Sequence, residues 1–198
     1  MDNTGQDATA EMAGLLQAAG GGDALAWRMI VDRYSRRIFA LAKSRCRDSD
    51  VSEEITQSVL ATVALKVGAG SYQELGRFES WLFRVTMNRI RDHVRRVKRS
   101  PVVGDVSGRI EREVSRETEK ADGGTLERLK WAVGQLSDQD RDVIELRHHG
   151  DLSFKQMADI LEEPVGTLLA RHHRALRKLK DLLESMDDEG RVRGKVDR

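Results

Sequence analysis

The stretch from Asp151 to Lys180, DLSFKQMADILEEPVGTLLARHHRALRKLK, constrains the fold more than any other part of this 198-residue chain. Ser153 is followed three residues later by Gln156, which is the spacing of a capping box at the start of a helix. Proline suits the first turn of a helix and is disfavoured inside one, so Pro164 marks the start of a second helix. The stretch therefore predicts a helix-turn-helix.

The second helix of this motif has two contrasting sides. Leu168, Ala175, Leu176 and Leu179 recur with helical spacing and are expected to face the protein interior. The opposite side carries cations that suit phosphates or base edges in a major groove. The residues predicted to contact DNA are Pro164, Thr167, Arg171, Arg174, Arg177 and Lys178. A charged helix that merely faces solvent remains the alternative interpretation.

Composition favours a soluble, helical protein whose DNA affinity comes from local patches. Aromatic residues make up only 5% of the chain, which disfavours a sheet-based interior, and the net charge is +1. We expect an all-α fold of two small helical domains joined by a flexible linker, the C-terminal one a helix-turn-helix. The predicted segments are a mobile N-terminal segment 1–22, a helical bundle 23–99, a flexible linker 100–125, a helix-turn-helix domain 126–184 and a charged tail 185–198.

Catalytic, metal and cofactor sites are not expected. The single cysteine, Cys46, excludes an internal disulfide and is interpreted as a small packing residue. The adjacent pairs His148-His149 and His172-His173 point to different helix faces, unlike a metal-binding i, i+4 pair. No phosphate loop or nucleophile motif is present, and the lack of an apolar span or signal peptide favours a cytoplasmic location.

A second basic helix is predicted from Phe78 to Arg99, in the first of the two domains. It carries seven cations, Arg84, Arg89, Arg91, Arg95, Arg96, Lys98 and Arg99, against only two acidic residues. Such an excess is the electrostatic footprint of a phosphate-binding surface. Tyr72, in the loop before it, and Phe78, at its edge, offer rings for stacking on an unpaired base. The alternative is that both rings simply cover the end of the bundle.

Two motif sets in this order resemble the bacterial sigma factors, the promoter-specificity subunits of RNA polymerase, in their extracytoplasmic-function (ECF) class. SEEITQSVL, from Ser52 to Leu60, is similar to the polymerase-binding pattern of that family. WLFRVTMNRIRDHVRR is similar to its Trp-Leu segment, and PVGTLLARHHRALRKL is similar to its promoter-reading helix. The resemblance implies a protein that directs promoter-specific initiation without catalysing a reaction.

The resemblance also implies roles for named residues. The helix from Pro164 would read the minus-thirty-five element, and the first domain would melt and capture the minus-ten element through Tyr72, Phe78, Asn88, Arg91, Arg95 and Arg96. Glu53, Glu54 and Gln57 would dock on the clamp helices of the polymerase's largest subunit, with the flap of the second-largest subunit as a further contact. Promoter DNA and an anti-sigma factor or other inhibitor are the remaining expected partners.

Some positions depart from the family pattern. Leu169 and Ala170 stand where lysine and serine are common, so we expect contact with the minus-thirty-five element to be weaker or differently specified. An exposed Leu169 would either pack within the domain or belong to an apolar surface that an inhibitor covers. Ser58 replaces a common acidic residue, which raises the hypothesis that phosphorylation of Thr56 or Ser58 tunes docking. A conventional helix-turn-helix regulator acting without polymerase, or a pure interaction protein, remain the rival interpretations.

Overall fold

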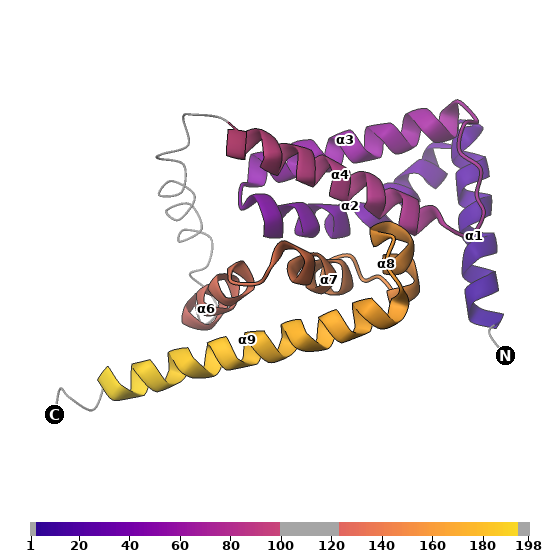
Figure 1. Ribbon diagram of the computed structural model, residues 1–198. Helices are drawn as coiled ribbons and strands as arrows, with labels where there is room; N and C mark the ends of the chain where they lie inside the picture. The colour runs from indigo at the N-terminus through magenta and orange to yellow at the C-terminus, as the bar shows by residue number, and fades with distance from the viewer. Residues whose placement is uncertain (1–2, 100–122, 194–198) are drawn as a thin grey trace.

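The computed structural model describes residues 3–99 and 123–193, and the regular structure in these two stretches is entirely α-helical (Figure 1). The N-terminal half contains α1 (Asn3–Gly20), α2 (Ala24–Cys46), α3 (Ser49–Gly68) and α4 (Phe78–Arg99). The C-terminal half contains α6 (Gly123–Gly134), α7 (Asp138–His148), α8 (Phe154–Leu161) and α9 (Val165–Arg193). The predicted all-α fold is confirmed. Within the described stretches, no helix combines the length and apolar content needed to cross a membrane.

Short-range signals explain where the helices of the N-terminal half begin and end. The Asp23 side chain accepts hydrogen bonds from the backbone N–H groups of Leu25 and Ala26, which caps α2. Asp48 caps α3 in the same way through the N–H of Val51. Arg47 adopts a left-handed conformation with φ of 58°, and this ends α2 just before Asp48 turns the chain into α3.

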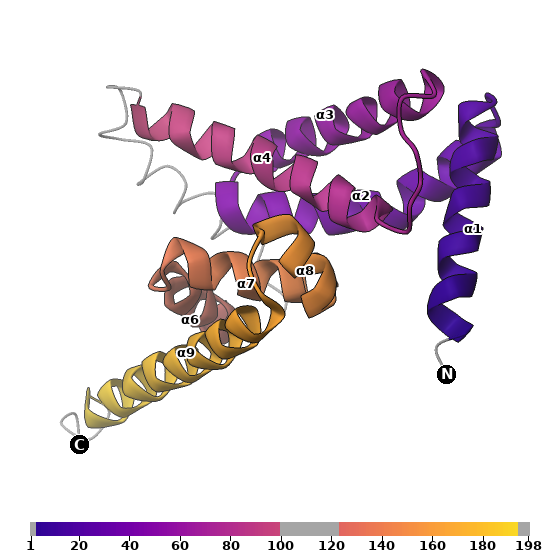
Figure 2. The same ribbon diagram turned by 45° about the vertical axis from the view of Figure 1, so that its right-hand side comes forward.

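The N-terminal segment is part of the bundle, which corrects the prediction that residues 1–22 form a mobile lead-in. Helix α1 packs against α2 and α3 (Figure 2). Met12, Leu16 and Ala19 are buried at helical spacing, so one side of α1 is covered by the neighbouring helices. Helix α1 ends at Gly20.

The boundaries of the C-terminal half also differ from the prediction. Residues 100–122 of the predicted linker lie outside the described residues, and α6 already begins at Gly123 rather than after 125. Helix α9 continues to Arg193, so the predicted charged tail from 185 onward is helical for most of its length. Just before this stretch, Leu182 and Leu183 pack against the buried cluster that α9 forms with α6 and α7.

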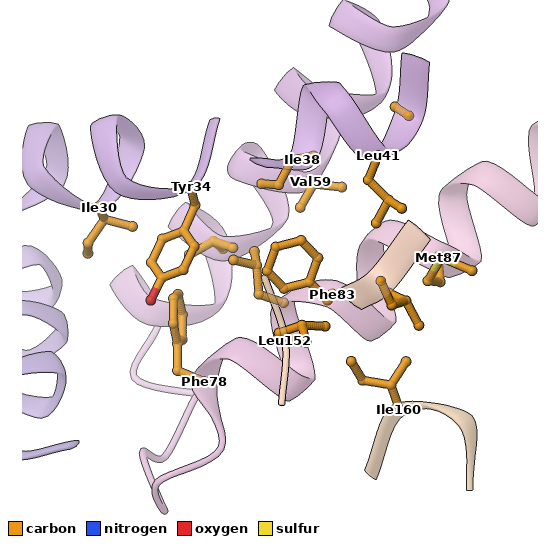
Figure 3. Close-up of a cluster of buried hydrophobic side chains, with 14 of the residues drawn as sticks. Ile30, Tyr34, Ile38, Leu41, Val59, Phe78, Phe83, Met87, Leu152 and Ile160 are labelled. Atoms are coloured by element: carbon orange, nitrogen blue, oxygen red, sulfur yellow. The ribbon is translucent and has the colours of Figure 1, made fainter. Parts of the chain in front are cut away.

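The two halves share one hydrophobic cluster, in addition to the linker by which the sequence predicts two small helical domains to be joined. In both views α8 lies directly under α4 (Figures 1 and 2). Leu152 and Ile160 of the C-terminal half join Phe83 and Met87 of α4 among the buried side chains of this shared cluster (Figure 3). The physical reason is that the helix-turn-helix has a second apolar side, which is covered by the N-terminal half.

Candidate nucleic-acid interface

The helix-turn-helix forms as the sequence predicts. Ser153 and Gln156 make both hydrogen bonds of a capping box at the start of α8. Glu162 ends α8 in a left-handed conformation with φ of 58°, and α9 begins at Val165, directly after Pro164. The carbonyl oxygen of Pro164 accepts the N–H groups of Thr167 and Leu168, so proline supplies the first turn of α9.

The outer face of α9 exposes most of the residues predicted to contact DNA. Leu168, Ala175 and Leu179 are buried as expected, whereas Leu176 is 40% exposed and does not face the interior. Leu176 directly follows the buried Ala175, and the rotation of about 100° per residue in an α-helix places it outside the apolar stripe. The exposed candidates are Pro164, Thr167, Arg174, Arg177 and Lys178. The Lys178 ammonium also donates to the carbonyl of Gln135 at 2.8 Å.

Arg171 is the exception on this helix, because it is buried. Its exposed fraction is 9%, and its Nη1 donates to Glu163 Oε1 at 2.8 Å. The hydrogen bond to Glu163 raises the pKa of Arg171 above its ordinary value. Glu163 lies in the turn before α9, so the pair fastens the turn to the helix. In this arrangement Arg171 is not presented to a base edge, contrary to the prediction.

One face of α4 carries a stripe of four polar residues with i, i+4, i+7 and i+11 spacing, Arg84, Asn88, Arg91 and Arg95. Asn88 and Arg95 are exposed, as is Arg96 on the next face. Arg91 instead reaches the C-terminal half, where its Nη2 donates to Asp142 Oδ2 at 2.9 Å. Arg84 donates to the backbone carbonyl of Asp159. Half of the stripe is therefore occupied by α7 and α8.

The two predicted stacking rings lie against the bundle. Phe78 is only 3% exposed, with its ring centroid 5.5 Å from Tyr34 and 5.7 Å from Tyr72. This burial corrects the expectation of a free ring at Phe78 and agrees with the alternative that it covers the bundle. Tyr72 is partly buried beside Trp81 at 4.7 Å, and its hydroxyl donates to Glu74 at 2.8 Å. Burial and this hydrogen bond raise the pKa of Tyr72.

The acidic residues of α3 lie on an open surface. Glu53, Glu54 and Gln57 are exposed, and Gln57 Nε2 donates to Glu53 Oε1 at 3.1 Å. Thr56 points inward, where its hydroxyl donates to the carbonyl of Ser52 at 2.7 Å. A buried hydroxyl is inaccessible to a kinase, so the phosphorylation hypothesis loses Thr56 and retains Ser58.

A group of charges between the halves, buried apart from the partly exposed Arg91, was not predicted from the sequence. This interdomain charge group consists of Arg45 of α2, Arg91 of α4, and Asp142 and Glu145 of α7. Arg45 Nη1 lies 3.2 Å from Asp142 Oδ1 and 3.5 Å from Glu145 Oε2. Burial raises the pKa of Glu145 to about 7, although Arg45 and Arg141 partly oppose the shift. The sequence shows only that two acidic residues, Asp142 and Glu145, flank Val143 and Ile144, and this pattern does not identify the arginines that they contact.

The remaining candidates do not form a chemical site. Among the described residues, no three His, Cys, Asp or Glu side chains gather as a metal site would require. His148 and His172 stack with centroids 5.9 Å apart. Burial raises the pKa of the Cys46 thiol to about 11, which keeps it protonated and poorly nucleophilic.

Two family comparisons match the two halves separately. The Sigma-70 region 2 family matches residues 30–100, and the Sigma-70 region 4 family matches residues 132–181. The first match begins within α2 and includes α3 and α4, with the acidic face of α3 and the polar stripe of α4. The second spans the helix-turn-helix.

Whole proteins and solved structures agree with these matches. The ECF RNA polymerase sigma factor SigW of Bacillus subtilis is 30% identical over 175 residues, covering 81% of this chain and 92% of the relative. BldN of Streptomyces coelicolor, another ECF sigma factor, is 26% identical and covers 88% of this chain and 67% of the relative. The structure of CnrH, solved in complex with the cytosolic domain of CnrY, has a TM-score of 0.64 at 23% identity, covering 86% of this chain and 96% of CnrH.

Proposed function

This chain belongs to the sigma-70 family as an extracytoplasmic-function sigma factor that directs promoter-specific transcription initiation, and from this premise we propose how its surfaces divide the work. Helix α9 reads the minus-thirty-five element, α4 and the preceding loop bind the minus-ten element, and α3 docks on core RNA polymerase. The observation that carries the proposal is the pairing of an exposed basic helix in each half with an exposed acidic face on α3.

At the minus-thirty-five element, the exposed side of α9 enters the major groove. Thr167 and Arg174 lie seven residues apart on one face of the first turns, where base edges are within reach. Arg177 and Lys178 follow toward the phosphate backbone and fix the register. Arg171 binds Glu163 in the turn before α9, which supports base recognition by the other residues of α9 without Arg171.

At the minus-ten element, the polar stripe of α4 follows the separated strand. Asn88, Arg95 and Arg96 are exposed for contact, and Arg91 becomes free if Asp142 withdraws. Tyr72 is the ring left at the surface for stacking, which is worth about 1–3 kcal/mol per base. Binding energy of this size is comparable to the cost of unstacking one base, so no nucleotide hydrolysis and no enzymatic activity of the chain's own is required.

On the polymerase, the exposed Glu53, Glu54 and Gln57 of α3 meet the clamp helices of the largest subunit. An acidic face is suited to a basic partner. The helix-turn-helix half would contact the flap of the second-largest subunit. CnrH and the Bartonella quintana RpoE were solved with CnrY and the anti-sigma factor NepR, respectively, which supports an anti-sigma factor as a further partner. Promoter DNA and polymerase place this action in the bacterial cytoplasm.

Run-off transcription with bacterial core RNA polymerase on a promoter library tests the proposal. We expect wild-type protein to select two-element promoters and the Glu53→Lys, Glu54→Lys variant to lose this activity. The variant Asp181→Lys, Glu184→Lys makes the same charge change on exposed residues of α9 and is expected to stay active. A wild-type protein that binds duplex DNA yet never directs the polymerase would support the helix-turn-helix regulator instead.

A further inference from the structure

The loop that joins α3 to α4 carries a carboxylate with two partners inside the protein. Glu74 Oε2 accepts the hydroxyl of Tyr72 at 2.8 Å, and Glu74 Oε1 accepts the backbone N–H of Arg77 at 2.9 Å. The carbonyl of Arg77 in turn accepts the N–H of Trp81 in the first turn of α4. Glu74 therefore connects the ring of Tyr72 to the start of the helix that carries the polar stripe.

The ring of Tyr72 is also held by two aromatic neighbours. Its centroid lies 4.7 Å from that of Trp81, with 35° between the ring planes, and 5.7 Å from that of Phe78, which meets it at 81°. These tilted and edge contacts are the arrangements that aromatic pairs prefer. Because the hydroxyl is bound to Glu74, the ring is fixed at its tip as well as along its body.

The backbone of the loop is fixed too. The carbonyl of Lys66, near the end of α3, accepts the N–H groups of Ser71 and Tyr72 and the Ser71 hydroxyl. Gly76 has φ of 74°, which side chains disfavour, and a Cβ there would lie 3.4 Å from Thr9 Cγ2 of α1. The loop runs beside α1 in both views (Figures 1 and 2). The partly exposed ring of Tyr72 is thus presented by an ordered loop.

We propose that Glu74 is a positioning residue for capture of the minus-ten base, because its carboxylate holds Tyr72 in the orientation in which the exposed part of the ring stacks on a base that has left the duplex. This inference rests on the proposed function. A ring that is fixed before DNA binds loses less conformational freedom on stacking. More of the stacking energy then opposes the cost of unstacking the base.

The negative charge of Glu74 makes two roles of this residue distinguishable. A carboxylate on a DNA-binding loop repels phosphates, so removal of Glu74 would strengthen DNA binding if only its charge mattered. Removal weakens binding if its two hydrogen bonds place the ring. Glu74 is partly buried and each of its oxygens accepts a hydrogen bond within the loop, which favours the second role.

Binding of single-stranded minus-ten DNA to the protein assembled with core RNA polymerase tests the proposal. The DNA has the minus-ten sequence of a promoter selected by run-off transcription, and a series of oligonucleotides replaces one base at a time by an abasic site. Affinity is measured by fluorescence anisotropy. At the captured position we expect removal of the base to weaken binding about tenfold in wild type but only about twofold in Glu74→Ala.

On the intact oligonucleotide, Glu74→Ala should bind about fivefold more weakly than wild type, because a displaced ring stacks poorly. Glu74→Gln keeps one acceptor oxygen in place of two and should fall between them. Equal or stronger binding by Glu74→Ala would overturn the proposal, since the carboxylate would then act through its charge or not at all.

Tyr72→Phe removes the hydroxyl and keeps the ring. We expect this change to weaken binding of the intact oligonucleotide in wild type and to have no further effect in Glu74→Ala, where the hydroxyl has already lost its partner. Additive losses in the double variant would contradict the proposal, because the hydroxyl and the carboxylate would then act separately.

Two controls separate positioning from folding. Glu74→Ala should match wild type in affinity for core RNA polymerase and for a minus-thirty-five duplex, and an equal loss for all three ligands would assign Glu74 to folding alone. Glu127→Ala removes the same charge from the exposed side of α6 and should match wild type on every oligonucleotide. A wild-type protein that is weakened at no abasic position would instead count against base capture, and so against the proposed function itself.

Discussion

The two basic helices, α4 and α9, have similar sequence signatures but different availability in the structure. Helix α9 exposes Thr167, Arg174 and Arg177 to solvent along its outer face. Helix α4 exposes Asn88 and Arg95, while Arg84 and Arg91 of the same stripe are bound by oxygen atoms of the C-terminal half. The difference shows that a cluster of cations determines what a helix is able to bind, whereas its neighbours determine when it is free to bind.

The same contrast applies within α9 itself. Arg171 and Arg174 are three residues apart and both were predicted to contact DNA. One is buried against Glu163 and the other is exposed. A guanidinium that already has a carboxylate partner stabilises the fold, and one that faces water remains available for a phosphate or a base.

The largest expected effect comes from breaking the apolar contact between the halves. Leu152→Ala removes a fully buried side chain of the shared cluster and is expected to lower the free energy of unfolding by about 2–5 kcal/mol. Urea denaturation followed by circular dichroism measures this. Leu129→Ala, on the exposed side of α6, is the control and should change stability by less than about 0.5 kcal/mol. Similar small losses in both variants would mean that the halves are not packed in solution.

Arg174→Ala tests whether the exposed side of α9 reads DNA. We expect a loss of about 1–3 kcal/mol in affinity for a minus-thirty-five duplex, because a good base contact has that value. Stability should be unchanged, since the side chain is exposed. Fluorescence anisotropy across a salt series measures both affinity and its salt dependence. Unchanged affinity for every duplex would show that Arg174 does not contact the minus-thirty-five element.

Arg171→Ala should show the opposite pattern to Arg174→Ala. Loss of the hydrogen bond to Glu163 is expected to reduce stability by about 1–2 kcal/mol. The slope of log affinity against log salt concentration should stay at the wild-type value, because no phosphate contact is lost. A slope that falls by about one unit would instead identify Arg171 as a phosphate contact and contradict its positioning role.

The smallest expected effect is a pH dependence of the packing between the two halves. Burial raises the pKa of Glu145 to about 7 where the two halves are packed together, and exposure returns it toward its ordinary value of 4.5. The packed arrangement therefore binds the proton more tightly, so this contribution to its stability is fully present below pH 4.5 and declines as pH rises through 7. The groups that face Glu145 are Arg45 of α2 and Arg141 and Asp142 of α7, with Arg91 of α4 bound to Asp142.

Fluorescence energy transfer between dyes on the two halves measures this dependence. We expect the ratio of protein with separated halves to protein with packed halves to rise on the order of tenfold from pH 5 to pH 7 in the wild type. Glu145→Gln carries no titrating group at this position and should remove most of the change. A wild-type response that survives in Glu145→Gln would assign the dependence to another group.

Much of the local structure was predictable because it depends on neighbours in the chain. The Ser153–Gln156 capping box and the start of α9 after Pro164 follow from backbone hydrogen bonding over three or four residues. The packing of α1 was harder to predict, because its alanine- and glycine-rich sequence gives a weak signal, and only contact with α2 and α3 makes Met12 and Leu16 part of the interior.

The sequence by itself determined the all-α class, the helix-turn-helix, the position of both basic helices and membership of the sigma-70 family, because these depend on residue order and on spacing along single helices. Only the tertiary structure decided that Phe78 and Arg171 are buried and that Arg91 is bound to Asp142. The physical reason is that burial and ion pairing depend on which helix faces meet, and partners 51 residues apart in the chain leave no periodic signal of their meeting.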